Sequence, residues 1–376
     1  MFKKEIVMKK SISYMMAACL GISLLLSGCA GSGQAPQKPA AESSSESGSA
    51  AKTSSALQEK TTVSQDSADS GKASDSAGVD GIRVGSLKGP TSMGLASLID
   101  KASKGETENS YEFTMSGTAD ELVGKIANAD LDIALLPANI ASVLYAKTQG
   151  QVTAIDINTL GVLYVVASDD SIQTMNDLKG RTIYMTGKGT TPEYVMNYLL
   201  SQNGLSISNV DLQFKSEAAE VASILKEDST AIGVLPQPFA ATACIQNEAL
   251  KTVLDLTEQW NLLNQESKSM LVTGVTVIRS DFLRENKAAA ELFLKDHQAS
   301  AAFAAEHVEE AAELIAAQGI VEKAPIAKKA LPLCNIVCLT GEEMKAALSG
   351  YLSVLYEQDA KSIGGAMPGD DFYYIP

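Results

Sequence analysis

The sequence predicts an α/β protein whose folded part consists of two successive α/β units. Strand-like and helix-like segments alternate from Gly81 onward, which is the pattern of a mainly parallel sheet covered by helices. The alternation restarts near Ser168, and a strong strand followed by helices closes the chain. With 376 residues, 45% of them hydrophobic, the chain is long enough for one or two domains with extensive cores.

The N-terminus has the features of a secretory signal. Four lysines within the first ten residues precede an apolar segment at Met15–Leu26, which is too short for a comfortable membrane span. The sequence Leu26-Ser27-Gly28-Cys29 also resembles the bacterial lipobox. We therefore expect residues 1–28 to be a lipoprotein signal peptide and Cys29 to be lipidated. A short transmembrane anchor is the alternative.

Residues 29–79 contain mainly Ser, Gly, Ala, Glu, Gln and Lys, with almost no large apolar side chains. Such a segment cannot bury enough surface to offset the entropy of ordering. We interpret it as a flexible tether that holds a folded body near the outer face of the cell membrane.

The first α/β unit begins with three strand–helix pairs. In a parallel sheet the ligand lies outside the carboxyl ends of the strands. The predicted strands are Gly81–Gly85, Tyr111–Met115 and Leu131–Leu136. Their carboxyl ends carry these candidate residues: Lys88, Gly89, Pro90, Thr91, Ser92, Thr118, Pro137 and Asn139.

The second unit begins after a predicted strand at 160–167. Strands follow at 182–185, 211–215, 231–235 and 251–255, with helices between them. A strand at 272–279, helices at 281–307, 308–318 and 341–358, and a strand at 335–339 are expected to return to the first unit. The expected lobes are residues 80–167 with 273–376, and 168–272. The two crossings, near 167–170 and 268–273, would form the hinge.

The strand–turn–helix segment Thr182–Leu200 is the most distinctive stretch. Gly187 and Gly189 permit a tight turn, and Thr191-Pro192 is typical of a helix start. Unpaired N–H groups and nearby hydroxyls would suit an anionic or acceptor-rich ligand. An ordinary connection in which the threonines only cap the helix is an equally good interpretation. No phosphate-loop or dinucleotide-binding motif is present.

Five motifs resemble those of the substrate-binding lipoproteins of ABC importers. Within that family the chain is similar to the SsuA/THI5-like group, which includes nitrate, taurine, alkanesulfonate and thiamine-precursor binders. The motifs are Gly89–Gly94, Asp132–Asn139, Asn176–Tyr184, Gly187–Glu193 and Leu235–Phe239.

The resemblance implies a type II periplasmic-binding-protein fold, with two α/β lobes, each a mostly parallel sheet, joined by a two-strand hinge. It covers about residues 81–359. It implies capture of a small molecule between the lobes by hinge closure, and delivery to an ABC permease. In the second lobe it implies ligand contacts at Thr186, Gly187, Gly189, Thr190, Thr191, Glu193, Pro236 and Gln237.

Two ligand classes remain open, a small oxyanion such as a sulfonate and a pyrimidine-like molecule. No arginine is placed to clamp an oxyanion, which leaves backbone N–H groups, hydroxyls, Lys88 and Lys188. Glu193 in the cleft would repel an anion and favour an amine or ring N–H, whereas Glu193 facing solvent would only complement the helix dipole. Tyr184, Tyr194 and Phe239 could stack on a ring, although a buried core position is the more usual role for most of them.

A pyrimidine-synthesis-like enzyme on the same fold is the main alternative. Such enzymes depend on histidine and lysine chemistry, but His297 and His307, the two histidines, lie in a helical stretch away from the predicted cleft. Cys334 and Cys338 do not match zinc spacing with them and are too far apart along a strand for a disulfide. We therefore expect no catalytic residue, metal or cofactor, and buried thiols.

The third possibility is a surface sensor or adhesion module that keeps the binding fold.

The net charge of -15 argues against nucleic acid as a partner, because nucleic-acid binders need a basic face. We expect a monomer whose partners are a small molecule, an ABC permease and, through Cys29, the lipid bilayer.

Overall fold

The computed structural model describes residues 81–376. The predicted signal peptide, Cys29 and the tether to residue 79 lie outside the described residues. Within residues 81–376, the search for a helix both long enough and apolar enough to cross a membrane finds none.

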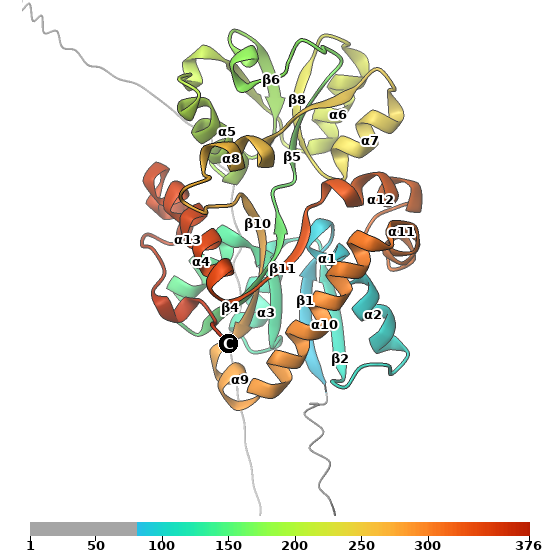
Figure 1. Cartoon of the computed structure of the whole chain (residues 1–376), viewed down its shortest axis with the longest axis vertical. Coiled ribbons are helices and arrows are strands. Elements are labelled where there is room, and N and C mark those ends of the chain that lie inside the picture. Colours follow the sequence, from blue (N-terminus) through green and yellow to red (C-terminus); the bar gives the residue numbers. More distant parts are fainter. Residues whose placement is uncertain (1–80) are drawn as a thin grey trace, which may run out of the picture. The chain divides into compact units, whose positions relative to one another are not determined.

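The first sheet has six strands in the order β11-β4-β10-β3-β1-β2 (Figure 1). β1 runs parallel to β2 and β3, whereas β10 is antiparallel to β3 and β4, and β11 is antiparallel to β4. Its strands are β1 (Ile82–Leu87), β2 (Tyr111–Ser116), β3 (Ile133–Pro137), β4 (Val152–Leu160), β10 (Val272–Arg279) and β11 (Ile336–Leu339).

The second sheet has five strands in the order β7-β6-β8-β5-β9. β6 runs parallel to β7 and β8, while β5 is antiparallel to both β8 and β9. Its strands are β5 (Leu163–Ala167), β6 (Thr182–Met185), β7 (Asp211–Phe214), β8 (Ile232–Pro236) and β9 (Lys251–Asp255).

The predicted α/β class with two sheet-containing units is confirmed, and the sheets are mixed. The parallel arrangement holds for β2-β1-β3 and β7-β6-β8. The strands that link the two sheets are antiparallel to their neighbours. β4 leads out of the first sheet and β10 leads back into it, so these two neighbours must run in opposite directions.

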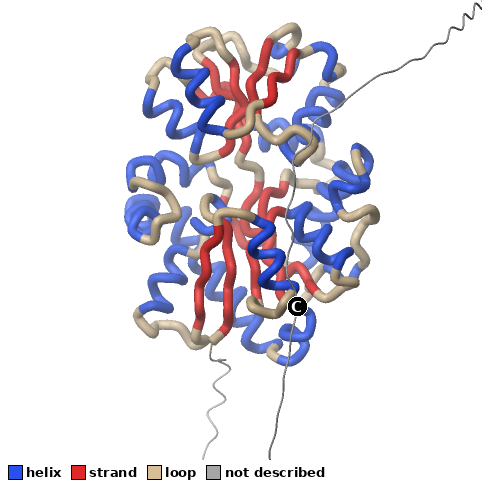
Figure 2. Tube along the Cα trace, turned by 180° about the vertical axis from the view of Figure 1, so that it is seen from behind, coloured by secondary structure: helices blue, strands red, loops and turns tan. Residues whose placement is uncertain are grey.

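Helices cover both faces of each sheet (Figure 2). In the first half of the described chain these are α1 (Pro90–Met93), α2 (Ala96–Ser103), α3 (Ala119–Ala127), α4 (Ala138–Lys147), α5 (Thr191–Gln202) and α6 (Ala218–Glu227). The others are α7 (Phe239–Gln246), α8 (Leu256–Leu263), α9 (Ser280–Glu285), α10 (Lys287–Glu306), α11 (Val308–Ala317), α12 (Ala324–Ala330) and α13 (Gly341–Gln358). Short 3-10 turns are η1 (Met175–Leu178), η2 (Ile207–Asn209), η3 (Leu331–Leu333), η4 (Ala360–Ile363) and η5 (Asp370–Phe372).

The single strand predicted at 160–167 is wrong, because two strands of different sheets meet there. β4 ends at Leu160, and β5 begins at Leu163 and pairs with β8 and β9. The first crossing therefore lies at Gly161 and Val162, earlier than the predicted 167–170. The apolar run continues through the crossing, so hydrophobicity alone could not reveal the break. Gly161 is needed because a Cβ there would collide with the Thr257 hydroxyl and Leu271.

Three helical regions also differ from the prediction. The helix expected at 281–307 is divided at Asn286 into α9 and α10, and neither α8 nor α12 was predicted. The strand predicted at 335–339 is confirmed as β11, which pairs with β4 at the edge of the first sheet.

An aromatic cluster connects the two sheet-containing units on one side of the crossings. Trp260 of α8 is fully buried, with its ring 4.5 Å from that of Tyr198 in α5 and 5.6 Å from that of Tyr351 in α13. Since α13 also contacts β4 and β10, this cluster packs the helices of the second sheet against those of the first.

We predict that Gly274→Ala destabilises the protein by about 1–3 kcal/mol, the typical cost of overpacking. Gly274 lies in β10, and an added Cβ would meet the Asn158 amide oxygen and stand 2.7 Å from Thr91 Cγ2. The matched control is Gly124→Ala in α3, where a Cβ meets nothing within 4 Å. The control should stabilise by roughly 0.5–1 kcal/mol through helix propensity. Urea unfolding of both variants checks this, and equal effects would contradict the packing at Gly274.

Candidate ligand-binding cavity

A cavity of about 440 Å³ is lined by segments that belong to both sheets. Lys88, Gly89 and Gly117 follow β1 and β2 in the first sheet, at the carboxyl ends of parallel strands. The cavity is also lined by residues that follow β8 and by the segment that runs from the end of α11 into α12. These are Pro238, Phe239, Thr242, Ile320, Val321, Glu322 and Ile326.

The turn after β1 holds Lys88 at the cavity. The Lys88 backbone N–H donates to the Ser116 carbonyl at 3.0 Å, which ties the ends of β1 and β2 together. Gly89 has φ 117° and ψ −149°, a conformation that favours glycine. Its carbonyl accepts from the Ser92 and Met93 N–H groups, so the chain turns directly into α1 and leaves the Lys88 side chain exposed.

Thr91 and Ser92, two predicted ligand residues, are buried and use their hydroxyls within the turn. Thr91 Oγ1 donates to the Leu87 carbonyl at 3.1 Å, and Ser92 Oγ contacts the same carbonyl and Ser86 Oγ. Both side chains stabilise the entry into α1. Pro90 is the first residue of α1, where the absence of an N–H costs nothing.

The other predicted residues of the first sheet also have identifiable positions. Thr118 is the exposed N-cap residue of α3, next to the cavity residue Gly117. Pro137 precedes α4, and Asn139 Nδ2 donates to the Ser362 carbonyl at 3.4 Å. Asn139 therefore contacts the C-terminal segment.

The turn between β6 and α5 closes on itself. Gly187 has φ 84° and Gly189 has φ 70°, as a tight turn requires. Thr190 Oγ1 donates to the Gly187 carbonyl at 2.7 Å, and the Gly189 N–H donates to Glu193 Oε2 at 2.5 Å. The Glu193 carboxylate thus caps its own turn, an orientation that sequence reasoning did not consider.

This turn lies beside the C-terminal end of α13 rather than at the 440 Å³ cavity. The Tyr194 hydroxyl is 3.1 Å from both the Gly189 carbonyl and an Asp359 carboxylate oxygen. Gln358 Nε2 donates to the Tyr194 carbonyl at 2.9 Å. Burial and the bond to Asp359 raise the pKa of Tyr194. The structure therefore does not bring Thr186, Thr190 or Thr191 together with Lys88 around this cavity.

The segment after β8 contributes directly to the cavity. Pro236 ends β8, and the Gln237 N–H donates to the Val162 carbonyl in the first crossing at 3.0 Å. Gln237 Oε1 accepts a hydrogen bond from the Ala241 N–H at 3.2 Å, so this side chain stabilises the first turn of α7. The cavity residues are the next ones along the chain, Pro238 and Phe239.

The four arginines all pair with acidic side chains, which agrees with the prediction that none of them clamps an oxyanion. Asp132 binds both Arg83, at 2.6 Å, and Arg279, at 3.5 Å. The remaining two arginines pair with acidic neighbours, Arg181 with Asp169 and Arg284 with Glu285. None of the four lines the cavity.

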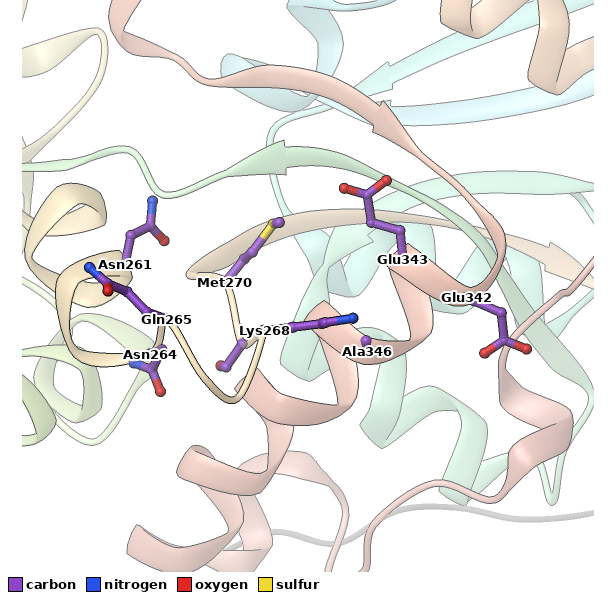
Figure 3. A pocket seen from close by; sticks show the side chains of 9 residues that line it. Asn261, Asn264, Gln265, Lys268, Met270, Glu342, Glu343 and Ala346 are labelled. Carbon is purple, nitrogen blue, oxygen red and sulfur yellow. The ribbon is translucent and has the colours of Figure 1, made fainter.

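A larger cavity of about 600 Å³ lies between the α8–β10 connection and the first turns of α13 (Figure 3). It contains no carboxyl end of a parallel strand. Asn264, one of its residues, accepts from the Tyr198 hydroxyl and donates to the Trp260 carbonyl. Its charged lining residues are Lys268, Glu342 and Glu343, so two carboxylates outnumber one ammonium group. These features make it a poorer candidate for an oxyanion.

Sequence reasoning missed the part of the cavity formed by 320–326. These residues lie more than two hundred positions after Lys88, and no local motif marks them. The rest of the cavity lies close to the predicted strand ends. Gly117 is next to the predicted Thr118, and Pro238 is next to the predicted Gln237.

Comparison with known proteins identifies the family. Residues 104–313, more than half of the chain, match the family model of "ABC transporter, phosphonate, periplasmic substrate-binding protein". The chain therefore belongs to this family of ABC-transporter substrate-binding proteins. Among proteins of curated function, none matches the chain.

Solved structures share the fold. An ABC transporter protein from Parabacteroides distasonis is 23% identical, with a TM-score of 0.65, over 78% of this chain and 98% of that one. The aliphatic sulphonate binding protein SsuA from Escherichia coli is 15% identical, with a TM-score of 0.62, over 79% and 92%. SsuA from Xanthomonas axonopodis pv. citri, bound to MOPS, is 10% identical, with a TM-score of 0.54, over 78% and 96%.

The protein is thus the substrate-binding component of an ABC import system, which binds a small solute outside the cytoplasm. The expectation that it is a binding protein and not an enzyme is confirmed by the family. The desulfurization enzyme DszB also resembles the chain, at 15% identity and a TM-score of 0.54, and this likeness concerns the fold alone.

Proposed function

We propose that the protein is a lipid-anchored receptor that captures a small phosphonate or sulfonate in the 440 Å³ cavity and presents it to an ABC permease. One observation carries the proposal. An exposed lysine, Lys88, lines the same cavity as apolar side chains from both sheet-containing units. The cavity volume is in the range of small-molecule sites.

The charges around the cavity favour an anion. Lys88 makes no ion pair among the described residues, whereas Lys188 lies 5.8 Å from the centre of the Phe214 ring, away from the cavity. Glu322 lines the cavity, but it is 77% exposed and pairs with Lys323 at 3.2 Å. An amine-bearing ligand was expected only if the Glu193 carboxylate faced the cleft. Glu193 instead accepts from the Gly189 N–H of its own turn, which favours the anion.

The walls favour a ligand with a short apolar part. Phe239 is 40% exposed, which is unusual for a phenylalanine, and Ile320, Val321 and Ile326 line the same cavity. An oxyanion head bound by Lys88 and a hydrocarbon part against these side chains would satisfy both chemistries. The family description and the two sulfonate-binding neighbours name ligands of this type.

Capture would depend on the two crossings. A ligand that touches Lys88 and Phe239 stabilises the arrangement in which the two units approach each other. The change in backbone angles that lets the two units approach would occur at Gly161–Val162 and in the connection between α8 and β10. The permease would then recognise the ligand-bound arrangement.

We predict that Lys88→Met weakens phosphonate or sulfonate binding by about 10- to 150-fold, because a charged hydrogen bond contributes about 1.5–3 kcal/mol. Calorimetric titration with a methyl- or ethyl-substituted phosphonate and sulfonate measures this. The control is Lys188→Met, which removes the same charge outside the cavity and should leave the affinity unchanged. Equal affinities of wild type and Lys88→Met would rule out the assigned cavity.

Membrane attachment through Cys29 has a separate test. Cys29→Ser should release the protein from the membrane fraction, because the acylated thiol is lost. Cys19→Ser, within the predicted signal peptide, should remain anchored. Fractionation of cells that express each variant distinguishes them, and a Cys29→Ser protein that stays fully in the membrane would refute lipidation at this residue.

A further inference from the structure

A buried group of potential metal ligands lies in the first sheet, apart from the ligand cavity. Asp156 of β4, His297 of α10 and Cys338 of β11 place one ligand atom each within 4.8 Å of one another. None of the three lines the 440 Å³ or the 600 Å³ cavity. Three elements far apart in the sequence thus bring an oxygen, a nitrogen and a sulfur atom to one point.

The histidine and the aspartate are fully buried. His297 Nδ1 is 3.0 Å from Asp156 Oδ2, and both side chains have 0% exposure. Nδ1 is therefore the ring nitrogen that faces Asp156, while Nε2 lies across the ring from it and has no hydrogen-bond partner among residues 81–376. Burying a carboxylate is costly unless polar partners surround it, so Asp156 and His297 form a polar site inside the core.

Neighbouring polar groups hold the aspartate in place. Thr276 Oγ1 of β10 donates to Asp156 Oδ1 at 2.8 Å. Asn158 Nδ2 in turn donates to Thr276 Oγ1 at 3.2 Å, and both residues are buried. This is the kind of supporting hydrogen bond that orients the carboxylate of a metal site.

We propose that Asp156, His297 and Cys338 form a binding site for a divalent transition-metal ion of the zinc type. A set of carboxylate, imidazole and thiolate suits zinc or cobalt better than the hard ions magnesium and calcium. Ligand bonds of about 2.0–2.3 Å hold the donors of a tetrahedral ion roughly 3.3–3.8 Å apart. Since Asp156 Oδ2 and His297 Nδ1 are already 3.0 Å apart, the Cys338 sulfur is the atom that has to approach, by up to about 1 Å.

The position of Cys338 allows this movement. β11 is the edge strand of the sheet, and its pairing with β4 is irregular between Ile336 and Leu339. The thiol is half-buried, and its sulfur is 4.0 Å from the Leu294 carbonyl oxygen. Without an ion, burial and the nearby Asp156 raise the pKa of Cys338. Binding the ion replaces the thiol proton, which passes to the solvent.

A bound ion would join β4, β11 and α10 next to the first crossing. Just before β11, Asn335 Nδ2 donates to the Gly161 carbonyl at 2.7 Å. Fixing β11 would therefore also fix one contact of the crossing, so the ion would act as a structural clamp distinct from the transported ligand.

Cobalt titration of the full chain, purified in detergent and stripped with a chelator, tests the site. We expect one equivalent of Co²⁺ to bind, with a thiolate-to-cobalt charge-transfer band that Zn²⁺ abolishes by displacement. Cys338→Ala and His297→Gln should each remove the band. The controls Cys244→Ala and His307→Gln change the same residue types elsewhere and should keep it.

Two measurements keep the test decisive if a core variant fails to fold. In the wild type, Zn²⁺ should protect Cys338 from alkylation, as followed by mass spectrometry, and leave the reactivity of Cys244 unchanged. Thr276→Val should weaken Co²⁺ binding by about 10- to 100-fold, the usual effect of losing a supporting hydrogen bond. No charge-transfer band in the wild type, or a band that persists in folded Cys338→Ala, would overturn the proposal.

Discussion

The antiparallel pairing of β4 with β10 is the constraint on which the rest of the structure depends. β4 leads out of the first sheet through Gly161 and Val162, and β10 returns to it after α8. Because these neighbours carry both crossings, they set where the second sheet begins and which strand ends meet around the cavity. Any adjustment between the two units has to be absorbed at the ends of these two strands.

The same pair also explains the division between packed and open regions. On one side the Trp260 cluster, together with the contact between Tyr194 and Asp359, fills the space between the helices of the two units. On the other side, Lys88 and Phe239 line a cavity that no side chain of residues 81–376 fills. A receptor needs such asymmetry, since one side keeps the units together while the other admits a ligand.

The sequence predicted the parallel parts of the fold well, because β1, β3, β6 and β8 are short apolar runs followed by helix starts. It failed at β4, where Asp156 and Asn158 resemble surface or turn residues. Their burial becomes acceptable only through partners distant in sequence, Thr276 and His297. The candidate site was predicted in part, since strand ends indicate Lys88 and Gly89. Local patterns could not show that the Thr190 hydroxyl is used within its own turn, or that 320–326 completes the cavity.

The most direct measurement is a crystal structure of the protein grown with a short-chain phosphonate or sulfonate. The proposed function predicts density for the ligand between Lys88 and Phe239, with the oxyanion at the Lys88 ammonium group. Density in the cavity between the α8–β10 connection and α13, with nothing at Lys88, would contradict the assigned site.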